Sequence, residues 1–99
     1  MKSLLEVINE AYKPTREDLE SFVNDYYNYF RISDSDRNVS YGKKFIKISK
    51  GHSVKAFIDY EGNIYKPASH ASPAKGIRGT IYDEFVDVFD ELGNPHYLK

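Results

Sequence analysis

The apolar residues in the first third of the chain recur at the spacing of an α-helix, in two groups separated by Pro14. The first group predicts a helix over residues 4–12. The second predicts a longer amphipathic helix that ends near Arg31. Thr15 and Asp18 form a weak capping box at its start. The apolar stripe of this longer helix is Leu19, Phe22, Val23, Tyr26 and Phe30. We expect the two helices to form an N-terminal hairpin.

The period changes to that of β-strands after a polar, turn-rich loop at residues 33–38. Strands are predicted over residues 43–50, 53–60 and 64–66. The turns between them are short, and short turns favour antiparallel pairing, so the strands should form a three-stranded meander. One face of this sheet is apolar and mostly β-branched, which is typical of a buried face. The residues of that predicted core face are Ile46, Ile48, Val54, Ala56 and Ile58.

The last apolar stretch again has helical spacing and follows a long segment of small residues at 67–79. It predicts a C-terminal helix over residues 81–92, capped by Thr80 and followed by Gly93. The predicted fold is α+β: an antiparallel three-stranded sheet packed with an N-terminal helical hairpin and a C-terminal helix. At 99 residues, the chain is expected to be a single domain over 1–99.

Composition excludes several broad classes of protein. Hydrophobic residues make up 40% of the chain, and no apolar run approaches the ~18 residues of a membrane-spanning helix. No apolar leader follows the start, so we expect a soluble protein with no membrane partner. The chain has no cysteine, which rules out disulfides and thiolate chemistry and suits a reducing compartment.

The net charge of -1 conceals a strong segregation of charge along the sequence. Residues 1–39 carry five bases and eight acids, whereas residues 40–80 carry eight bases and two acids. The remaining residues carry one base and five acids. Such a distribution can steer an anionic partner to one face of the molecule. Alternatively, the acidic ends fold against the basic middle and neutralise it.

The predicted outer face of the sheet is both basic and aromatic. Lysines neutralise phosphates, and flat rings stack on bases with a free energy of about 1–3 kcal/mol per base. The candidate nucleic-acid contacts on this face are Lys43, Phe45, Lys47, Lys55 and Phe57. The alternative is that the two phenylalanines form a second small core under the C-terminal helix, with the lysines reaching past them to water. Burial is the commoner fate of phenylalanine.

The segment at 67–79 combines cations with glycines just before a predicted helix start. Glycines let backbone N–H groups approach an anion, and the start of a helix is electropositive. The candidate anion-binding residues are Lys75, Gly76, Arg78 and Gly79. The spacing is not that of a P-loop. In the alternative interpretation the glycines serve turns, and Asp83 and Glu84 neutralise the two cations.

No catalytic or metal-binding constellation stands out. His52, His70 and His96 are widely separated, and without cysteine a structural zinc site would need carboxylates. A Ser-His-Asp set is recognised by geometry, which a sequence does not supply. We therefore expect a protein that is not an enzyme and that has no metal site and no cofactor.

Tyr27 and Tyr29 fall on opposite flanks of the stripe of the longer helix. Half-exposed tyrosines can mark a contact with another protein. The alternative is that both rings widen the buried face of the helix.

About two fifths of the chain resembles a group of small, uncharacterised proteins of tailed bacteriophages. The resemblance lies in Phe45 to Glu84, FIKISKGHSVKAFIDYEGNIYKPASHASPAKGIRGTIYDE, and above all in SVKAFID, KPAS, PAK and RG. The group often carries a bulky aromatic where this chain has His70, so the resemblance assigns no role to that position. It implies phage origin and location in the host cytoplasm, with no known activity.

Two main functional hypotheses follow. The first is non-enzymatic binding of nucleic acid by the basic sheet face and the Gly/Lys/Arg segment. The second is a protein-binding inhibitor of a host or antiviral-defence enzyme that presents acidic helices as a nucleic-acid mimic. Its acidic residues would be Glu17, Glu20, Asp83, Asp87, Asp90 and Glu91. A minor virion component is a third alternative, and the sequence does not indicate an oligomeric state.

Overall fold

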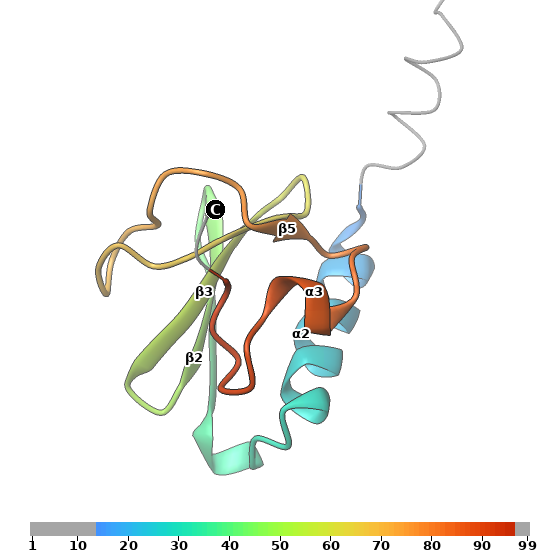
Figure 1. The fold of residues 1–99 in the computed structure, drawn as a ribbon, viewed down its shortest axis with the longest axis vertical. Helices are drawn as coiled ribbons and strands as arrows, with labels where there is room; N and C mark the ends of the chain where they lie inside the picture. Colours follow the sequence, from blue (N-terminus) through green and yellow to red (C-terminus); the bar gives the residue numbers. More distant parts are fainter. Residues whose placement is uncertain (1–13, 97–99) are drawn as a thin grey trace, which may run out of the picture.

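The computed structural model describes residues 14–96, and Figure 1 shows their arrangement. One long helix packs across one face of an antiparallel sheet, and the C-terminal segment fills the space beside the helix. The helix predicted over residues 4–12 lies outside the described residues, and with it the second arm of the predicted hairpin.

Helix α2 spans Arg16–Tyr29 and confirms the longer predicted helix. The predicted capping box is present: Thr15 N donates to Asp18 Oδ2 at 2.9 Å, and Asp18 N donates to Thr15 Oγ1 at 3.1 Å. These bonds satisfy backbone donors that the first turn of a helix leaves free. The buried residues of α2 are Leu19, Phe22, Val23, Tyr26 and Tyr27.

The sheet has five strands in sequence order, and every pairing is antiparallel. The strands are β1 (Arg37–Tyr41), β2 (Phe45–Lys50), β3 (Ser53–Asp59), β4 (Asn63–Tyr65) and β5 (Gly79–Thr80). The predicted three-stranded sheet is therefore wrong, although its three strands are the middle ones here. Strand β1 was not predicted because its segment holds a single aliphatic residue, Val39, among polar neighbours. Strand β5 was not predicted because two residues are too short to show a period.

The predicted C-terminal helix is also wrong. Only the four residues of α3 (Phe85–Val88) are helical, and a short 3-10 turn, η1 (Asp34–Asp36), precedes β1. After α3 the chain becomes extended and folds back, so that Phe89 pairs with Pro95. Asp90 stabilises this reversal by accepting bonds from two backbone N–H groups, those of Leu92 and Asn94. The stretch is rich in valine and aspartate, which have low helix propensity, so packing decides its shape.

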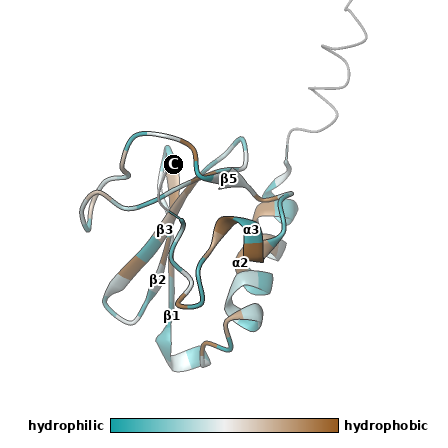
Figure 2. Cartoon of the chain, viewed as in Figure 1, coloured by the Kyte–Doolittle hydropathy of each residue, from teal (hydrophilic) through white to brown (hydrophobic). Residues whose placement is uncertain are grey.

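The sheet has an inner face, which bears Ile46, Ile48 and Ile58, and an outer face, which bears Phe45, Lys47 and Phe57. The inner face packs against α2 and the C-terminal segment in one core cluster. Four residues of the predicted core face are indeed buried: Ile46, Ile48, Ala56 and Ile58. Figure 2 shows hydrophobic residues on α3 and at alternating positions along the strands.

Val54 does not belong to this core. The pairing of β2 with β3 shifts after Ile48, so that Lys55 is the extra residue of a bulge and Val54 lies opposite Ser49. A one-residue shift moves a side chain to the other face of the sheet. Val54 consequently lines a small hollow on the outer face, together with residues 67–70.

The two tyrosines that flank the stripe of α2 differ in their surroundings. Tyr27 is 1% exposed and ties two strands together, because its hydroxyl accepts from Asn38 N and donates to Ser49 O at 2.7 Å. Tyr29 is 54% exposed. Tyr27 therefore widens the buried face, whereas Tyr29 remains available for contact.

Candidate functional site

The aromatic residues of the outer face form a small cluster of their own. Phe45 meets Phe57 edge to face with ring centroids 6.1 Å apart, and Tyr65 lies 5.6 Å from Phe45. Phe57 is 3% exposed and Phe45 is half-buried. A ring as enclosed as Phe57 cannot stack on a base, so the structure removes the stacking role predicted for it. The alternative of a second small core is correct for Phe57.

Residues 66–78, the connection between β4 and β5, lie against the outer face at Lys47 and Val54, where the C-terminal helix was expected. Lys47 Nζ, opposite Phe57 on the outer face, donates to His70 O at 3.3 Å. Within the connection, Pro67 pairs with Pro73, and Ala74 N donates to Lys66 O at 2.7 Å. These backbone contacts give the connection a defined shape over the sheet.

The predicted cations spread along the outer face and the connection. Lys43 is exposed in the turn before β2, Lys47 and Lys55 are half-buried on the strands, and Lys75 is exposed in the connection. At ~3.4 Å per residue, Lys43 and the bulge at Lys55 lie about 20 Å apart along the hairpin. This spacing suits an extended polyanion better than a single phosphate group.

Arg78 is held by the backbone of the C-terminal segment. Its Nη1 donates to His96 O at 3.0 Å, and its Nε donates to Gly76 O at 3.4 Å. Asp83, which the alternative interpretation paired with it, instead accepts from Thr80 N at 2.9 Å. Within residues 14–96 the guanidinium therefore forms no ion pair with a carboxylate, although part of its hydrogen-bonding capacity is used.

The helix start predicted at Thr80 is wrong, so the predicted anion site lacks the electropositive helix end beside it. Thr80 ends a strand, and the helix that follows has only four residues. Gly79 is explained by packing, since a Cβ at this position would lie 2.6 Å from Cγ2 of Val88. Gly76 has a φ of 97°, a left-handed turn conformation that glycine adopts without strain.

The side-chain ion pairs formed among residues 14–96 do not involve the candidate cations Lys43, Lys47, Lys55, Lys75 and Arg78. The two such pairs are Arg16–Glu20 and Arg37–Asp34, both outside residues 40–80. On the outer face, Asp59 accepts from Tyr65 Oη at 2.9 Å and from Asn63 N at 2.9 Å. Burial, followed by this bond to Asp59, raises the pKa of Tyr65. Asp59 thus organises the turn between β3 and β4.

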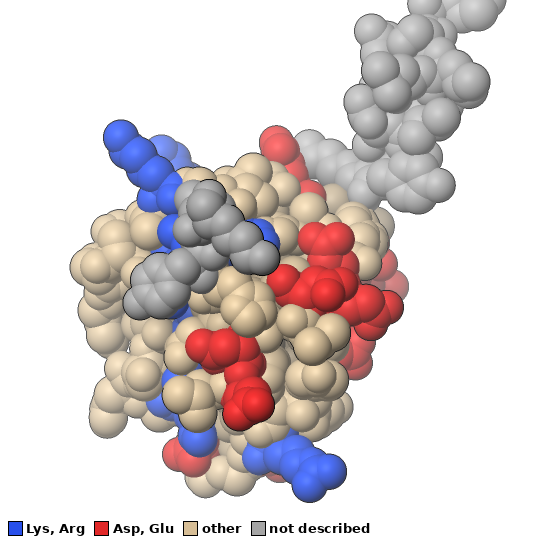
Figure 3. All heavy atoms as spheres, in the orientation of Figure 1, with Lys and Arg blue, Asp and Glu red and all other residues tan. Residues whose placement is uncertain are grey.

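Acidic side chains gather on the opposite side of the molecule. Figure 3 shows the largest group of them on the side of α2 and α3 and a second group near the middle of this view, while basic side chains lie toward the sheet and the connection and also by the lower end of α2. The exposed acids there include Glu17, Glu20, Asp83, Asp87 and Glu91, and Asp90 is half-buried. Folding therefore turns the segregation of charge along the sequence into a segregation in space.

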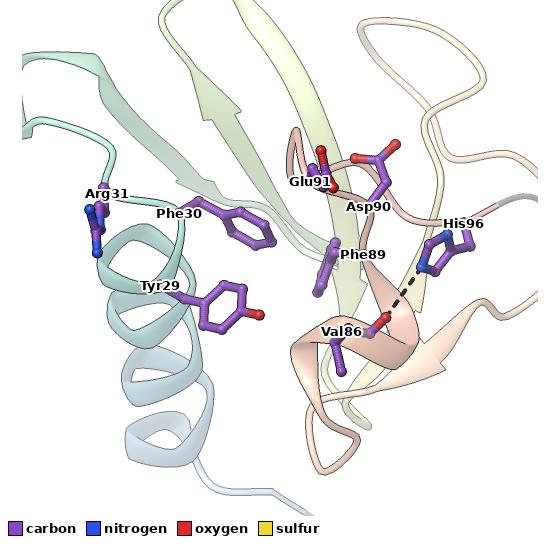
Figure 4. A pocket seen from close by; sticks show the side chains of 8 residues that line it. All are labelled: Tyr29, Phe30, Arg31, Val86, Phe89, Asp90, Glu91 and His96. Atoms are coloured by element: carbon purple, nitrogen blue, oxygen red, sulfur yellow. Dashed lines mark hydrogen bonds between the residues drawn. The ribbon is translucent and has the colours of Figure 1, made fainter.

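A groove of about 540 Å³ opens on this acidic side, between the end of α2 and the C-terminal segment. Figure 4 shows its lining: Tyr29, Phe30, Arg31, Val86, Phe89, Asp90, Glu91 and His96. This groove could not be predicted from the sequence, because it forms between segments about 60 residues apart. The only relevant signal was the exposed flank that carries Tyr29.

Among the described residues, no group of three or more His, Asp or Glu side chains is placed to hold a metal ion. Within the same part of the chain, every helix is too short or too polar to cross a bilayer.

No curated protein and no solved structure matches the chain significantly. A family model described as a family of unknown function matches residues 2–90, a range that includes every strand and α-helix of the described residues. The chain therefore belongs to this family of unknown function, DUF7717.

Proposed function

We propose that the chain is a non-enzymatic phage accessory protein that binds nucleic acid in the host cytoplasm through the outer face of its sheet. The observation that carries this proposal is the placement of charge. Cations of residues 40–80 lie on the outer face and in the connection, and the acids of α2 and α3 lie on the other side. A polyanion is attracted by the first side and repelled by the second, so a net charge of -1 does not oppose binding.

The proposed contacts are to phosphates. Lysine and arginine side chains spaced along an extended face follow a nucleic-acid backbone without reading its sequence. The contacting residues are Lys43, Lys47, Lys55, Lys75 and Arg78. Phe45 is half-buried and packs edge-on against two rings, so base stacking is not part of the proposal. Affinity should therefore depend weakly on base sequence and strongly on salt.

Fluorescence anisotropy with labelled 20-nucleotide single strands and duplexes, of DNA and RNA, tests this proposal. Each phosphate contact to a duplex contributes about -0.9 to the slope of log K against log salt concentration. Five contacts should give a slope of about -4.5 between 20 and 200 mM salt. A shuffled sequence should bind equally well. Failure to bind any of the four nucleic acids at 20 mM salt would falsify the proposal.

The acidic side supports a second candidate, an inhibitor that presents carboxylates to a basic site on a host or defence enzyme. Its acids are spread over α2, α3 and the turn at Asp90, and Figure 3 shows the largest group of acidic side chains on the side of α2 and α3. In this case the lysines of the outer face would be dispensable, and reversing the charge of Glu17 and Asp87 would abolish activity. If replacing the lysines of the outer face abolished inhibition instead, that result would contradict this second candidate.

A further inference from the structure

The groove between α2 and the C-terminal segment has a rigid aromatic floor. Phe30 and Phe89 lie 5.9 Å apart between ring centroids and meet edge to face, and Tyr29 stacks on Phe85 at 4.9 Å. Phe89 is 3% exposed and so belongs to the core. Because the floor is part of the folded core, the groove exists before any ligand arrives, which lowers the entropic cost of binding.

Exposed apolar side chains surround this floor. Tyr29 is 54% exposed and Val86 is 68% exposed, and both line the groove. Two of the five large exposed hydrophobic side chains in residues 14–96 therefore line the groove. Such a concentration of apolar surface around a concavity is typical of a contact site.

Arg31 occupies the edge of the groove in a strained backbone conformation. Ile32 N donates to Tyr27 O at 2.9 Å and Arg31 N to Asn28 O at 3.2 Å, which is the pattern of a Schellman motif that ends α2. The residue between these bonds adopts a left-handed conformation, usually taken by glycine, and Arg31 has a φ of 54°. A bulky residue kept at such a position next to a groove suggests that its side chain has a use.

The charges of the groove are arranged on two sides. Arg31 extends from the end of α2, whereas Asp90, Glu91 and His96 lie across the groove from it (Figure 4). Asp87, the residue after the lining residue Val86, is exposed and adds a further negative charge to this part of the chain. The C-terminal side is therefore acidic, and it is complementary to a basic ligand.

We propose that this groove binds a short segment of a partner protein that carries a bulky apolar side chain flanked by lysine or arginine. The apolar side chain enters between Tyr29 and Val86, and the basic side chain pairs with Asp90 and Glu91. Arg31 donates hydrogen bonds to main-chain carbonyls of the segment, a role for which its planar fork of donors is suited. This site is separate from the outer face of the sheet, so it stands or fails independently of nucleic-acid binding.

Fluorescence anisotropy with three labelled ten-residue peptides tests this inference at 150 mM salt. The first probe carries a leucine-phenylalanine pair with two lysines before it and two lysines after it. The second replaces the lysines by glutamates, and the third replaces the apolar pair by serines. The full-length protein should bind the first probe at least tenfold more tightly than either of the others. Equal affinity for the first and third probes would mean simple charge attraction and would overturn the proposal.

Variants at exposed positions separate binding from folding. Val86→Lys and Glu91→Lys should each weaken binding of the first probe at least tenfold, and the matched control Ile77→Lys, in the connection, should leave it unchanged. Arg31→Gly should weaken binding while raising the melting temperature, since glycine relieves the left-handed strain. Unchanged affinity in Val86→Lys, with a native circular dichroism spectrum, would contradict the assignment.

Two other occupants give different outcomes. If sedimentation shows that the wild type dimerises and Val86→Lys is monomeric, the groove is an interface between copies of the chain. Ile8→Glu places a charge in the apolar stretch near the N-terminus. If the first probe binds only to this variant, the N-terminal segment of the same chain occupies the groove in the wild type. Either result would overturn the proposal of a partner protein.

Discussion

At Gly79 the chain leaves room for Val88. A Cβ on this residue would lie 2.6 Å from Cγ2 and 3.1 Å from Cγ1 of that valine. Val88 is 2% exposed and packs in the core, so it cannot move away without disturbing its neighbours. A glycine beside two cations suggested an anion site, but its neighbours in space show a packing role.

Gly79→Ala should lower the free energy of unfolding by about 1–3 kcal/mol, because the added methyl group overpacks the core. Urea denaturation measures this loss. The matched variant combines Gly79→Ala with Val88→Ala, which removes the two clashing methyl groups. The combined loss should be smaller than the sum of the two single losses, and strictly additive losses would contradict the close contact.

The bulge at Lys55 shows how one residue alters the pattern of a strand. Val54 alternates correctly with Ala56 and Ile58 in the sequence, yet it lies on the outer face because the extra residue shifts the alternation. Nothing in the composition of the strand marks that position. The bulge depends on how β2 and β3 pair, which a period of two does not encode.

At the scale of elements, the C-terminal segment is held to α2 by aromatic packing and one buried hydroxyl. Tyr26 Oη donates to Gly93 O at 2.5 Å, and the ring meets Phe89 edge to face at 5.1 Å. Gly93 has a φ of 82°, and a Cβ there would lie 2.6 Å from Tyr26 Oη. The glycine thus allows both the turn and the close approach of the tyrosine.

The burial of Tyr26 predicts a loss of stability at alkaline pH. Burial, and to a smaller extent the nearby Tyr27 and Asp90, raises the pKa of Tyr26 above its ordinary value of about 10. Above pH 10 the unfolded chain releases this proton while the folded chain retains it. The stabilisation is therefore complete below pH 10 and is lost as the pH rises beyond it.

Tyr26→Phe should make this pH dependence shallower, as measured by urea unfolding at pH 8, 9, 10 and 10.5. Burial also raises the pKa of Tyr27, so some dependence should remain. At neutral pH the variant should lose about 1–3 kcal/mol, because the Gly93 carbonyl loses its donor. Tyr29→Phe, at an exposed position, serves as the control and should keep the wild-type profile. An equally steep decline in Tyr26→Phe would count against this origin of the effect.

At the scale of the whole molecule, the two faces differ in charge while the total is close to zero. This arrangement separates the effect of local charge from that of net charge. Lys43 lies in the turn before β2, and Arg31 lies at the end of α2 beside the acidic groove. Both side chains are exposed, and reversing either one changes the net charge by the same amount.

Lys43→Glu should weaken nucleic-acid binding and reduce the magnitude of the salt slope by about 1, because one phosphate contact is lost. Arg31→Glu should leave the slope unchanged and alter the affinity by less than twofold. Anisotropy titrations at several salt concentrations compare the two variants. Equal effects would indicate that binding depends on net charge alone and that the outer face has no special role.

Helix α2 and the three middle strands were predictable from the sequence, whereas the edges of the sheet and the C-terminal segment were not. Thr15 and Asp18, three residues apart, mark the start of α2 by two reciprocal hydrogen bonds between side chain and backbone. By contrast, β1 depends on its pairing with the edge of β2 and on the hydrogen bond from Asn38 N to the Tyr27 hydroxyl. Strand β5 depends on the close packing of Gly79 against Val88. These contacts join distant residues, which local periodicity does not describe.

The candidate sites divide in the same way. The positions of the cations along the chain and the exposed flank at Tyr29 could be identified from the sequence. The burial of Phe57, and the groove lined by Phe30 and Phe89, required the folded structure.

The sequence by itself determined the parts of this protein that depend on neighbouring residues: the capped helix, the alternating strands and the separation of charge along the chain. The tertiary structure decided which side of the sheet each group occupies, which aromatic rings are buried, and where a groove opens. The physical reason is that helix caps and strand periods are local, whereas burial and concavity arise from packing between segments far apart in the chain.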